Sequence, residues 1–286
     1  MRRGESFDSD IKRMKLYQQV ERVFNELAAL GIGKDDPIDV DQLARFDQYH
    51  YFGTEAVEEA VRGLRLTRDM DVLDVGAGIG GPARYLAHRV GCQVTALELQ
   101  PDLDEIAAGL TRRCRLSDRV EHVSGDILAG VVAKGRYDAL VSWLTFLHIT
   151  DRPTLYSRCF ESLKPGAGIY AEDYFARSPL SAAERRSLDD DISCEHVPTM
   201  ADYQTDLARA GFDRLELVDV TDAWRRFVVE RLESFRAARE RNRELHGAQI
   251  VQALDDFYTA VAALFRGGNL GGIRLVAWKP GEPAPR

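Results

Sequence analysis

Acidic side chains and glycines are concentrated in one segment of the sequence, DVLDVGAGIGGPARYLA, which spans residues 71–87. Asp74 lies inside its apolar part, where a buried carboxylate is costly unless it meets backbone N–H groups or a cationic ligand. Gly76 and Gly78 follow, and glycine can adopt positive φ or let a ligand lie against the main chain. This combination suits a tight turn, a cradle for phosphate, or a seat for another small cofactor.

Two further acids help to decide among these three roles of the glycine-rich segment. Glu98 and Asp126 end the next two apolar runs, in VTALE and HVSGD. The GxGxG spacing is more compact than the GxGxxG of pyrophosphate loops, and the acid before it would repel a diphosphate. Glu98 also has the position of the ribose-binding acid in nicotinamide-dependent oxidoreductases, so that class stays an alternative. A ligand with an ammonium group and an adenosine fits the three acids better.

The elements that must position these residues are short strands that alternate with helices. The β-branched or apolar runs are DVLDVG, CQVTALE, RVEHVSGD and YDALVSW, each separated from the next by a segment of helical pattern. Such alternation is typical of βαβ units and of a parallel sheet with both faces covered. We therefore predict an α/β fold with a doubly wound sheet, completed by strands in LKPGAGIYAEDY, FDRLELVDV and GGNLGGIRLVAWKP.

Helical segments flank this core. Apolar spacing predicts a helix that includes Leu16 and ends before GIGKDDP, and two helices, from Trp224 to Phe235 and from Ile250 to Leu264, before the last strand. Inserted helices near the carboxyl ends of strands are where α/β sheets bind ligands, so we regard them as a lid. We divide the chain into an N-terminal helical extension and active-site cover (1–53), a cofactor-binding core (54–175), an insert that forms part of the acceptor site (176–211), and a sixth strand, helical lid and last strand (212–286).

Composition excludes several classes of partner. The net charge of −8, from 38 basic and 46 acidic side chains, leaves no basic footprint for nucleic acid or an anionic membrane. No run approaches the roughly 20 apolar residues that cross a bilayer, and the first residues lack the apolar part of a signal peptide. We therefore expect a soluble, cytoplasmic protein, as a monomer or a homodimer. The four widely spaced cysteines predict reduced thiols, with neither a metal site nor a disulfide framework.

As an ordered set, VLDVGAGIGGPARYLA, VTALELQ, SGDI and LKPGAG resemble the successive motifs of class I S-adenosylmethionine-dependent methyltransferases, over residues 70–175. The resemblance implies a Rossmann-like methyltransferase fold with a seven-stranded, mostly parallel sheet whose last strand is antiparallel. It implies S-adenosylmethionine as the cofactor, held by Asp74, Gly76, Ala77 and Gly78 at the methionine moiety, by Glu98 at the ribose hydroxyls, and by Leu99, Asp126 and Ile127 at the adenine. Alternatively, Glu98 and Asp126 are helix caps or solvated acids at strand ends.

Three more segments, DQYHYFG, SWLTFLH and EDY, are similar to the phosphoethanolamine and sarcosine/dimethylglycine N-methyltransferases and to related natural-product methyltransferases. The phosphobase branch has its general base at the position of His148, for which the alternative role is a helix cap. His50 is the competing base. Tyr174 matches a residue that contacts the acceptor. Tyr49, Tyr51 and Trp143 are expected beside the cofactor, or else as packing residues.

Departures from the phosphobase enzymes bear on the acceptor. Those enzymes have an acid where this chain has Leu144, and they grip phosphate with an arginine and a tyrosine where this chain has DDDISCEHVPT. This acidic run would repel a phosphate, which favours an uncharged or cationic acceptor that is not phosphorylated. Alternatively, the run is a solvated helix face. Arg225 and Arg226 could still hold the carboxylate of an amino acid.

The sequence thus predicts methyl transfer from S-adenosylmethionine to nitrogen, slightly preferred, or oxygen of a small-molecule acceptor. This reaction is an in-line displacement, in which a protein mainly positions the reactants, excludes water and removes a proton where needed. The alternatives are a natural-product C-methyltransferase, a nicotinamide-dependent oxidoreductase, and a non-catalytic methyltransferase-like interaction module.

Overall fold

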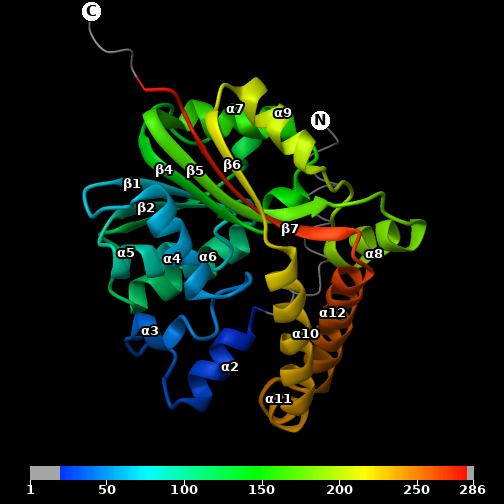
Figure 1. The fold of residues 1–286 in the computed structure, drawn as a ribbon. Helices are drawn as coiled ribbons and strands as arrows, with labels where there is room; N and C mark the ends of the chain where they lie inside the picture. Colours follow the sequence, from blue (N-terminus) through cyan, green and yellow to red (C-terminus); the bar gives the residue numbers. More distant parts are fainter. Residues whose placement is uncertain (1–19, 282–286) are drawn as a thin grey trace, which may run out of the picture.

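The computed structural model describes residues 20–281, so the predicted helical position Leu16 lies outside the described residues. One seven-stranded sheet lies between two layers of helices, and further helices extend from one of its edges (Figure 1). The strands are β1 (Asp71–Val75), β2 (Gln93–Glu98), β3 (Val120–Ser124), β4 (Tyr137–Trp143), β5 (Leu163–Ala176), β6 (Asp213–Asp219) and β7 (Leu270–Trp278).

The strand order is β3-β2-β1-β4-β5-β7-β6, in which β7 pairs antiparallel with both of its neighbours while the other pairings are parallel. This confirms the predicted doubly wound, mostly parallel sheet. The α-helices of the described residues are α2 (Arg22–Ala29), α3 (Val40–Leu43), α4 (Thr54–Leu64), α5 (Gly81–Arg89), α6 (Pro101–Arg113), α7 (Arg152–Ser162), α8 (Ala182–Ile192), α9 (Met200–Ala210), α10 (Thr221–Ala237), α11 (Arg239–His246) and α12 (Ala248–Gly267).

The two faces of the sheet bury different apolar sets because successive side chains of a strand point in opposite directions. Val72 and Val94 belong to the core on the side of α4 and α5, whereas Leu73 and Leu140 belong to the core on the side of α7 and α9. Figure 1 shows α4, α5 and α6 on one side of the sheet and α7 and α9 on the other. The layers are those expected for alternating strands and helices.

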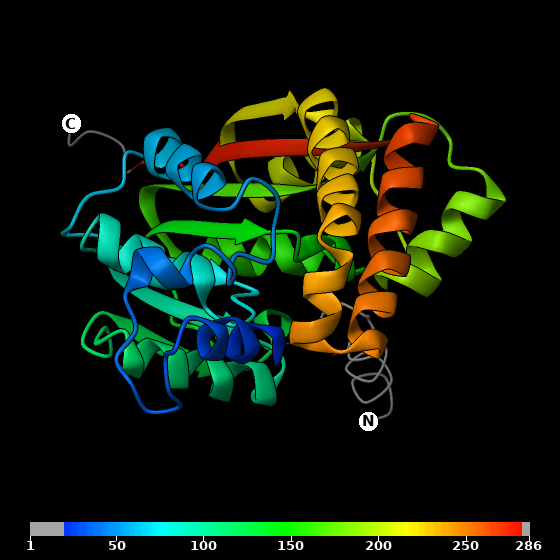
Figure 2. The same ribbon diagram turned by 90° about the horizontal axis from the view of Figure 1, so that it is seen from below.

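Helices α8, α10, α11 and α12 form the lid, in which α10 and α12 run side by side (Figure 2). The lid contacts the N-terminal helix α2 through Glu26, which pairs with Arg241 at 2.8 Å and with His246 at 3.3 Å. We predicted two helices where the structure has three. The missed helix is α11, RERNRELH, whose only buried residue is Asn242, so it has no apolar stripe to detect.

The two helices of the insert differ in their packing. Helix α8 packs against α12 in the lid, whereas α9 packs against α7 and β6, on a face of the sheet. Only the first part of the insert therefore lies with the lid. No helix within residues 20–281 has the length and apolarity to cross a bilayer.

Candidate active site

The predicted acids all lie at one edge of the sheet, where the carboxyl ends of the parallel strands meet. Asp74 is near the end of β1, Glu98 ends β2, and Asp126 follows β3. Two pockets open there, and Gly76 lines both of them. We call the pocket that contains Glu98 and Asp126 the ribose-side pocket, and the pocket that contains Asp74 the aspartate-side pocket.

The glycine loop between β1 and α5 requires bare backbone at two positions. Gly76 has a φ of 75°, and a Cβ atom there would lie 2.2 Å from the side chain of Thr145. Gly78 has a φ of 55°, but a Cβ atom there would meet no atom within 4 Å. Gly76 is thus needed for the fold of the loop. Gly78 leaves open space beside the aspartate-side pocket, as a loop that lies against a ligand should.

Glu98 is anchored to this loop. One carboxylate oxygen accepts the Gly78 N–H at 2.8 Å and the other accepts the Gln100 N–H at 3.0 Å. Glu98 is only 7% exposed, which excludes the alternative of a solvated acid. Burial raises its pKa, and the N–H groups of Gln100 and Gly78 oppose the rise. Each carboxylate oxygen has two acceptor sites, so Glu98 can still accept hydrogen bonds from a ligand.

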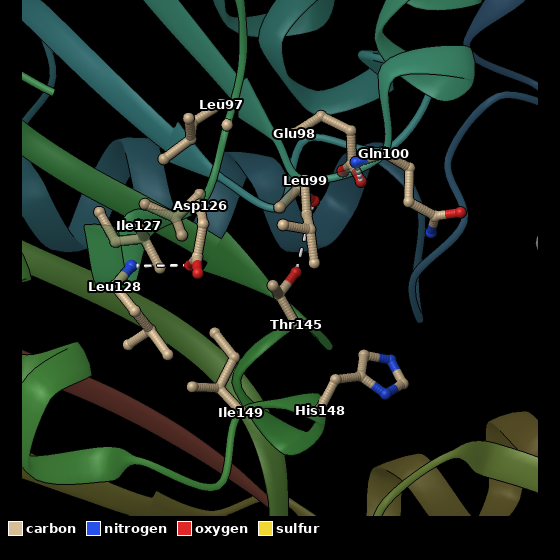
Figure 3. A pocket seen from close by; sticks show the side chains of 13 residues that line it. Leu97, Glu98, Leu99, Gln100, Asp126, Ile127, Leu128, Thr145, His148 and Ile149 are labelled. Atoms are coloured by element: carbon tan, nitrogen blue, oxygen red, sulfur yellow. Dashed lines mark hydrogen bonds between the residues drawn. The ribbon is translucent and has the colours of Figure 1, made fainter. Parts of the chain in front are cut away.

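Figure 3 shows the ribose-side pocket with Glu98 and Leu99 on one wall and Asp126 and Ile127 on another. Asp126 accepts the Leu128 N–H at 2.8 Å, so it caps the short 3-10 helix η2 (Ile127–Ala129). The capping role that we left open is therefore real, and it coexists with a place on the pocket wall. The apolar side chains present a flat slot between two acids, which suits an adenosine.

Asp74 is 1% exposed, and its Oδ2 atom has no hydrogen-bond partner among residues 20–281. Burial and, to a smaller extent, the charge of Glu98 raise the pKa of Asp74 to about 7. A buried carboxylate oxygen without a donor is destabilising, and native proteins rarely retain one without a function. The geometry therefore suits a cationic group in the aspartate-side pocket.

An aromatic wall closes the aspartate-side pocket. Trp143 and His50 stack with ring centroids 5.3 Å apart, and Tyr49 and Ala77 also line the pocket. Both ring nitrogens of His50 have partners, because Nδ1 lies 3.1 Å from the Tyr51 carbonyl and Nε2 lies 3.0 Å from Gln48 Oε1. Burial lowers the pKa of His50 to about 4. This geometry makes His50 a rigid wall residue and a poor candidate base.

His148 lies on the 3-10 helix η3 (Phe146–His148) and lines the ribose-side pocket (Figure 3). Its Nδ1 atom is 3.0 Å from the Ser193 carbonyl, an arrangement that fits a neutral ring donating its proton to that oxygen. Burial lowers the pKa of His148 to about 4. Asp151, whose side chain accepts the Thr154 N–H, is the cap of α7. The alternative that His148 caps this helix is therefore wrong.

Tyr174 and Tyr51 form a hydrogen-bonded pair with their hydroxyl oxygens 2.5 Å apart. Burial raises the pKa of both tyrosines above the ordinary value, so both are neutral donors and acceptors near pH 7. We expected Tyr51 beside the cofactor. It lines neither pocket and instead packs under the lid against Trp224 and Phe265.

The lid differs from our expectations in its charges. Asp189, Asp190 and Glu195 are exposed, whereas Asp191 is half-buried and accepts a hydrogen bond from Ser187 at 2.9 Å. None of these four acids lines either pocket. Arg226 is exposed too, and Arg225 donates to the Phe265 carbonyl at 3.1 Å.

Sequence reasoning missed Arg231, whose guanidinium lies 5.0 Å from the centre of the Tyr51 ring. The only feature of the sequence that pointed to Arg231 was its position four residues after Phe227, which places both on one face of a helix whose other face is apolar.

Comparisons with known proteins agree with this geometry. Residues 72–166 match the model of a methyltransferase domain family. The chain is 30% identical to phosphoethanolamine N-methyltransferase 1 of Zea mays over 64% of its length and 36% of the relative's. It is 28% identical to the glycine/sarcosine/dimethylglycine N-methyltransferase of Actinopolyspora halophila over 58% of its length and 29% of the relative's. The chain therefore spans well under half the length of these curated relatives.

A solved structure shows the same fold. Phosphoethanolamine N-methyltransferase 2 of Haemonchus contortus in complex with S-adenosyl-L-methionine superimposes with a TM-score of 0.75 at 21% identity, over 82% of this chain and 54% of that one. At this identity the likeness concerns the fold alone. Residues 72–166 are thus similar in sequence to a methyltransferase domain, and the chain has the Rossmann-like fold of this methyltransferase.

Proposed function

We propose that this protein is an S-adenosylmethionine-dependent methyltransferase that acts on nitrogen, in preference to oxygen, of a small molecule. One observation carries the proposal. Asp74, whose buried Oδ2 atom has no donor among residues 20–281, and a second buried acid, Glu98, flank the open backbone of Gly78 at the carboxyl ends of β1 and β2. Acids spaced in this way match an ammonium group at one end and ribose hydroxyls at the other.

Each residue then has a defined role. Asp74 holds the ammonium group of the aminoacyl part, and Glu98 accepts hydrogen bonds from the ribose hydroxyls. Leu99, Asp126 and Ile127 enclose the adenine. When bound, S-adenosylmethionine supplies an electrophilic methyl group for in-line displacement. Trp143 and His50 form the wall that keeps water from the aspartate-side pocket.

An acceptor that carries a proton on its nucleophile must lose it. His148 is the candidate base, since its ring is neutral above pH 4 and lies at the wall of the ribose-side pocket. Tyr174 does not act as a base, because burial raises its pKa well above 10. It can still donate a hydrogen bond to the acceptor or to the hydroxyl of Tyr51.

The acceptor is a small molecule in this proposal. The preference for an amine acceptor rests on the names of the relatives, which are N-methyltransferases. The residues that line the pockets fit a nitrogen or an oxygen nucleophile equally well. Because the acids of α8 line neither pocket, they give no reason to exclude a phosphorylated acceptor. We expect a monomer or a homodimer.

The test is transfer of a radiolabelled methyl group from S-adenosylmethionine to a panel of amines, amino acids, phenols and terpenoid acids. Mass spectrometry of the products assigns the methyl group to nitrogen, oxygen or carbon. Glu98→Ala should abolish transfer, whereas Glu121→Ala, at an exposed acid on the neighbouring strand β3, should not. Absence of both cofactor binding and transfer in the unaltered protein would favour a non-catalytic module.

A further inference from the structure

Arg231, on the lid helix α10, is a cation in an aromatic cage. Its guanidinium carbon lies 4.4 Å from the centre of the Tyr258 ring, 5.0 Å from that of Tyr51 and 5.6 Å from that of Phe227. Its Nε and Nη2 atoms are buried, and neither has a hydrogen-bond partner among the described residues. Two of the three guanidinium nitrogens therefore carry N–H donors that no group of residues 20–281 accepts.

The side chain of Arg231 is only partly exposed, and the two arginines that are fully buried within residues 20–281 have carboxylate partners. Arg84 pairs with Asp47 at 2.8 Å, and Arg152 lies 3.6 Å from Asp173. Arg231 has no ion pair within the described part of the chain, since its acidic neighbours on α10, Glu230 and Glu233, are exposed. Contact with aromatic rings recovers only part of the cost of desolvating a guanidinium. A missing anion explains the arrangement better than packing does.

Two other buried polar atoms have no hydrogen-bond partner among residues 20–281. They are Asp74 Oδ2 and Trp143 Nε1, and both residues line the aspartate-side pocket. From there His50 stacks on Trp143, and the next residue, Tyr51, lies under the guanidinium of Arg231. Among these groups only the carboxylate of Asp74, in the aspartate-side pocket, is purely an acceptor of hydrogen bonds. Under the lid, Arg231 supplies donors.

A second positive charge lies on the same side. The guanidinium of Arg22 is 5.1 Å from the centre of the Tyr49 ring. Tyr174, paired with Tyr51, adds a neutral hydroxyl. Two guanidinium groups thus lie among four tyrosines, Tyr49, Tyr51, Tyr174 and Tyr258, beneath the lid. This is an environment for an oxyanion.

We propose that Arg231 seats an anionic group of the methyl acceptor, a carboxylate or a phosphate, under the lid. The proposal rests on the proposed function and names its substrate class. A guanidinium can bind either oxyanion through two parallel hydrogen bonds. Anchored at Arg231, the acceptor extends past Tyr51 and Tyr174, so that its nucleophile reaches the region of Gly76, which lines both pockets. Arg231 is then the residue that selects acids over their neutral analogues.

The first test uses small anions as probes. Protein saturated with S-adenosylhomocysteine is titrated with acetate, with inorganic phosphate and with neutral acetamide, and the melting temperature is followed. We expect a saturable rise with at least one anion and none with acetamide. A response to acetate alone indicates a carboxylate, and a response to phosphate alone indicates a phosphate ester. The rise should persist in Arg226→Met, an exposed position on the same helix, and be absent in Arg231→Met.

The second test separates a ligand anchor from a packing residue. Because Arg231 is desolvated without a carboxylate partner, Arg231→Met should melt at the same temperature as the unaltered protein or higher when no anion is present. Acceptor pairs then give the specificity, for example sarcosine with sarcosinamide and phosphoethanolamine with ethanolamine. Arg231→Met should lower kcat/KM for the anionic member about 10- to 100-fold and leave the neutral member within about 3-fold.

Two results would overturn the inference. One is an anion response that is absent or equal in Arg231→Met and Arg226→Met. The other is a fall of several degrees in the melting temperature of anion-free Arg231→Met, which would make the guanidinium a packing group. Failure of the unaltered protein to bind S-adenosylhomocysteine is a different result, because it would overturn the proposed function itself.

Discussion

Asp74 should make the affinity for S-adenosylmethionine depend steeply on pH. Its pKa in the free protein is raised to about 7 by burial, with a smaller contribution from the charge of Glu98. Binding of an ammonium group favours the ionised carboxyl, so binding below pH 7 must release a proton. At pH 5 only about 1% of Asp74 is ionised, which predicts an affinity about 100-fold weaker than at the plateau. The plateau ends near pH 8, where an α-amino group loses its own charge, at about 7.7–8.0.

Isothermal titration calorimetry between pH 5 and pH 8 measures this dependence, and buffers of different ionisation enthalpy count the released protons. Asp74→Asn should remove the pH dependence below 7 and weaken binding at pH 7.5 by about 10- to 100-fold, because a charge-assisted hydrogen bond is lost. Asp71→Asn is the matched control, on the same strand but partly exposed and 4.0 Å from Lys164. A flat affinity from pH 5 to pH 8 would refute the role given to Asp74.

Other expectations concern the base and the loop. His148→Ala should lower kcat about 100-fold or more with a small change in cofactor affinity. The control His196→Ala, at an exposed histidine, should have no effect on kcat. Loss of turnover in His50→Ala but not in His148→Ala would show that the base is misassigned. Because the pKa of His148 is lowered to about 4, its neutral form persists as the pH falls, so kcat measured with saturating cofactor should hold down to about pH 5. Gly76→Ala should prevent stable folding of the loop, since its Cβ atom would lie 2.2 Å from Thr145, whereas Gly78→Ala should fold but bind the cofactor more weakly. Thermal melts measure the folding of both variants, and calorimetry measures their cofactor affinity. Equal melting temperatures of the two variants would contradict the structural role given to Gly76.

The sequence was sufficient for the core because local signals there agree with one another. Asp74 and Glu98 lie at or near the ends of β1 and β2, the glycine loop follows β1 and Asp126 follows β3, and parallel strands bring such positions to one edge. The sheet order and the placement of Glu98 and Asp126 therefore followed from pattern and resemblance. Gly76 could be recognised as a turn residue, but its contact with Thr145 depends on the packing of β4.

The lid was less predictable because its contacts are tertiary. Helix α11 is polar on nearly all sides and is held between α2 and α12, so it leaves no periodic signal. The sequence does not show that the rings of His50 and Tyr51, which are adjacent in the chain, pack on Trp143 and Tyr174 respectively. The acidic run of α8 attracted attention by composition alone, although its side chains line neither pocket. Arg231 became notable only once its donors were seen to be buried without acceptors.

Calorimetric titration of the protein and of its Glu98→Ala variant with S-adenosylmethionine tests the central claim most directly. Glu98 has two buried carboxylate oxygens, each able to accept one ribose hydroxyl beside its backbone N–H partner. We predict one site per chain in the unaltered protein and an affinity at least about 100-fold weaker in Glu98→Ala, because two charge-assisted hydrogen bonds are lost. Glu121→Ala should bind as the unaltered protein does. Equal affinity of Glu98→Ala, or binding of a nicotinamide dinucleotide in place of S-adenosylmethionine, would contradict the account.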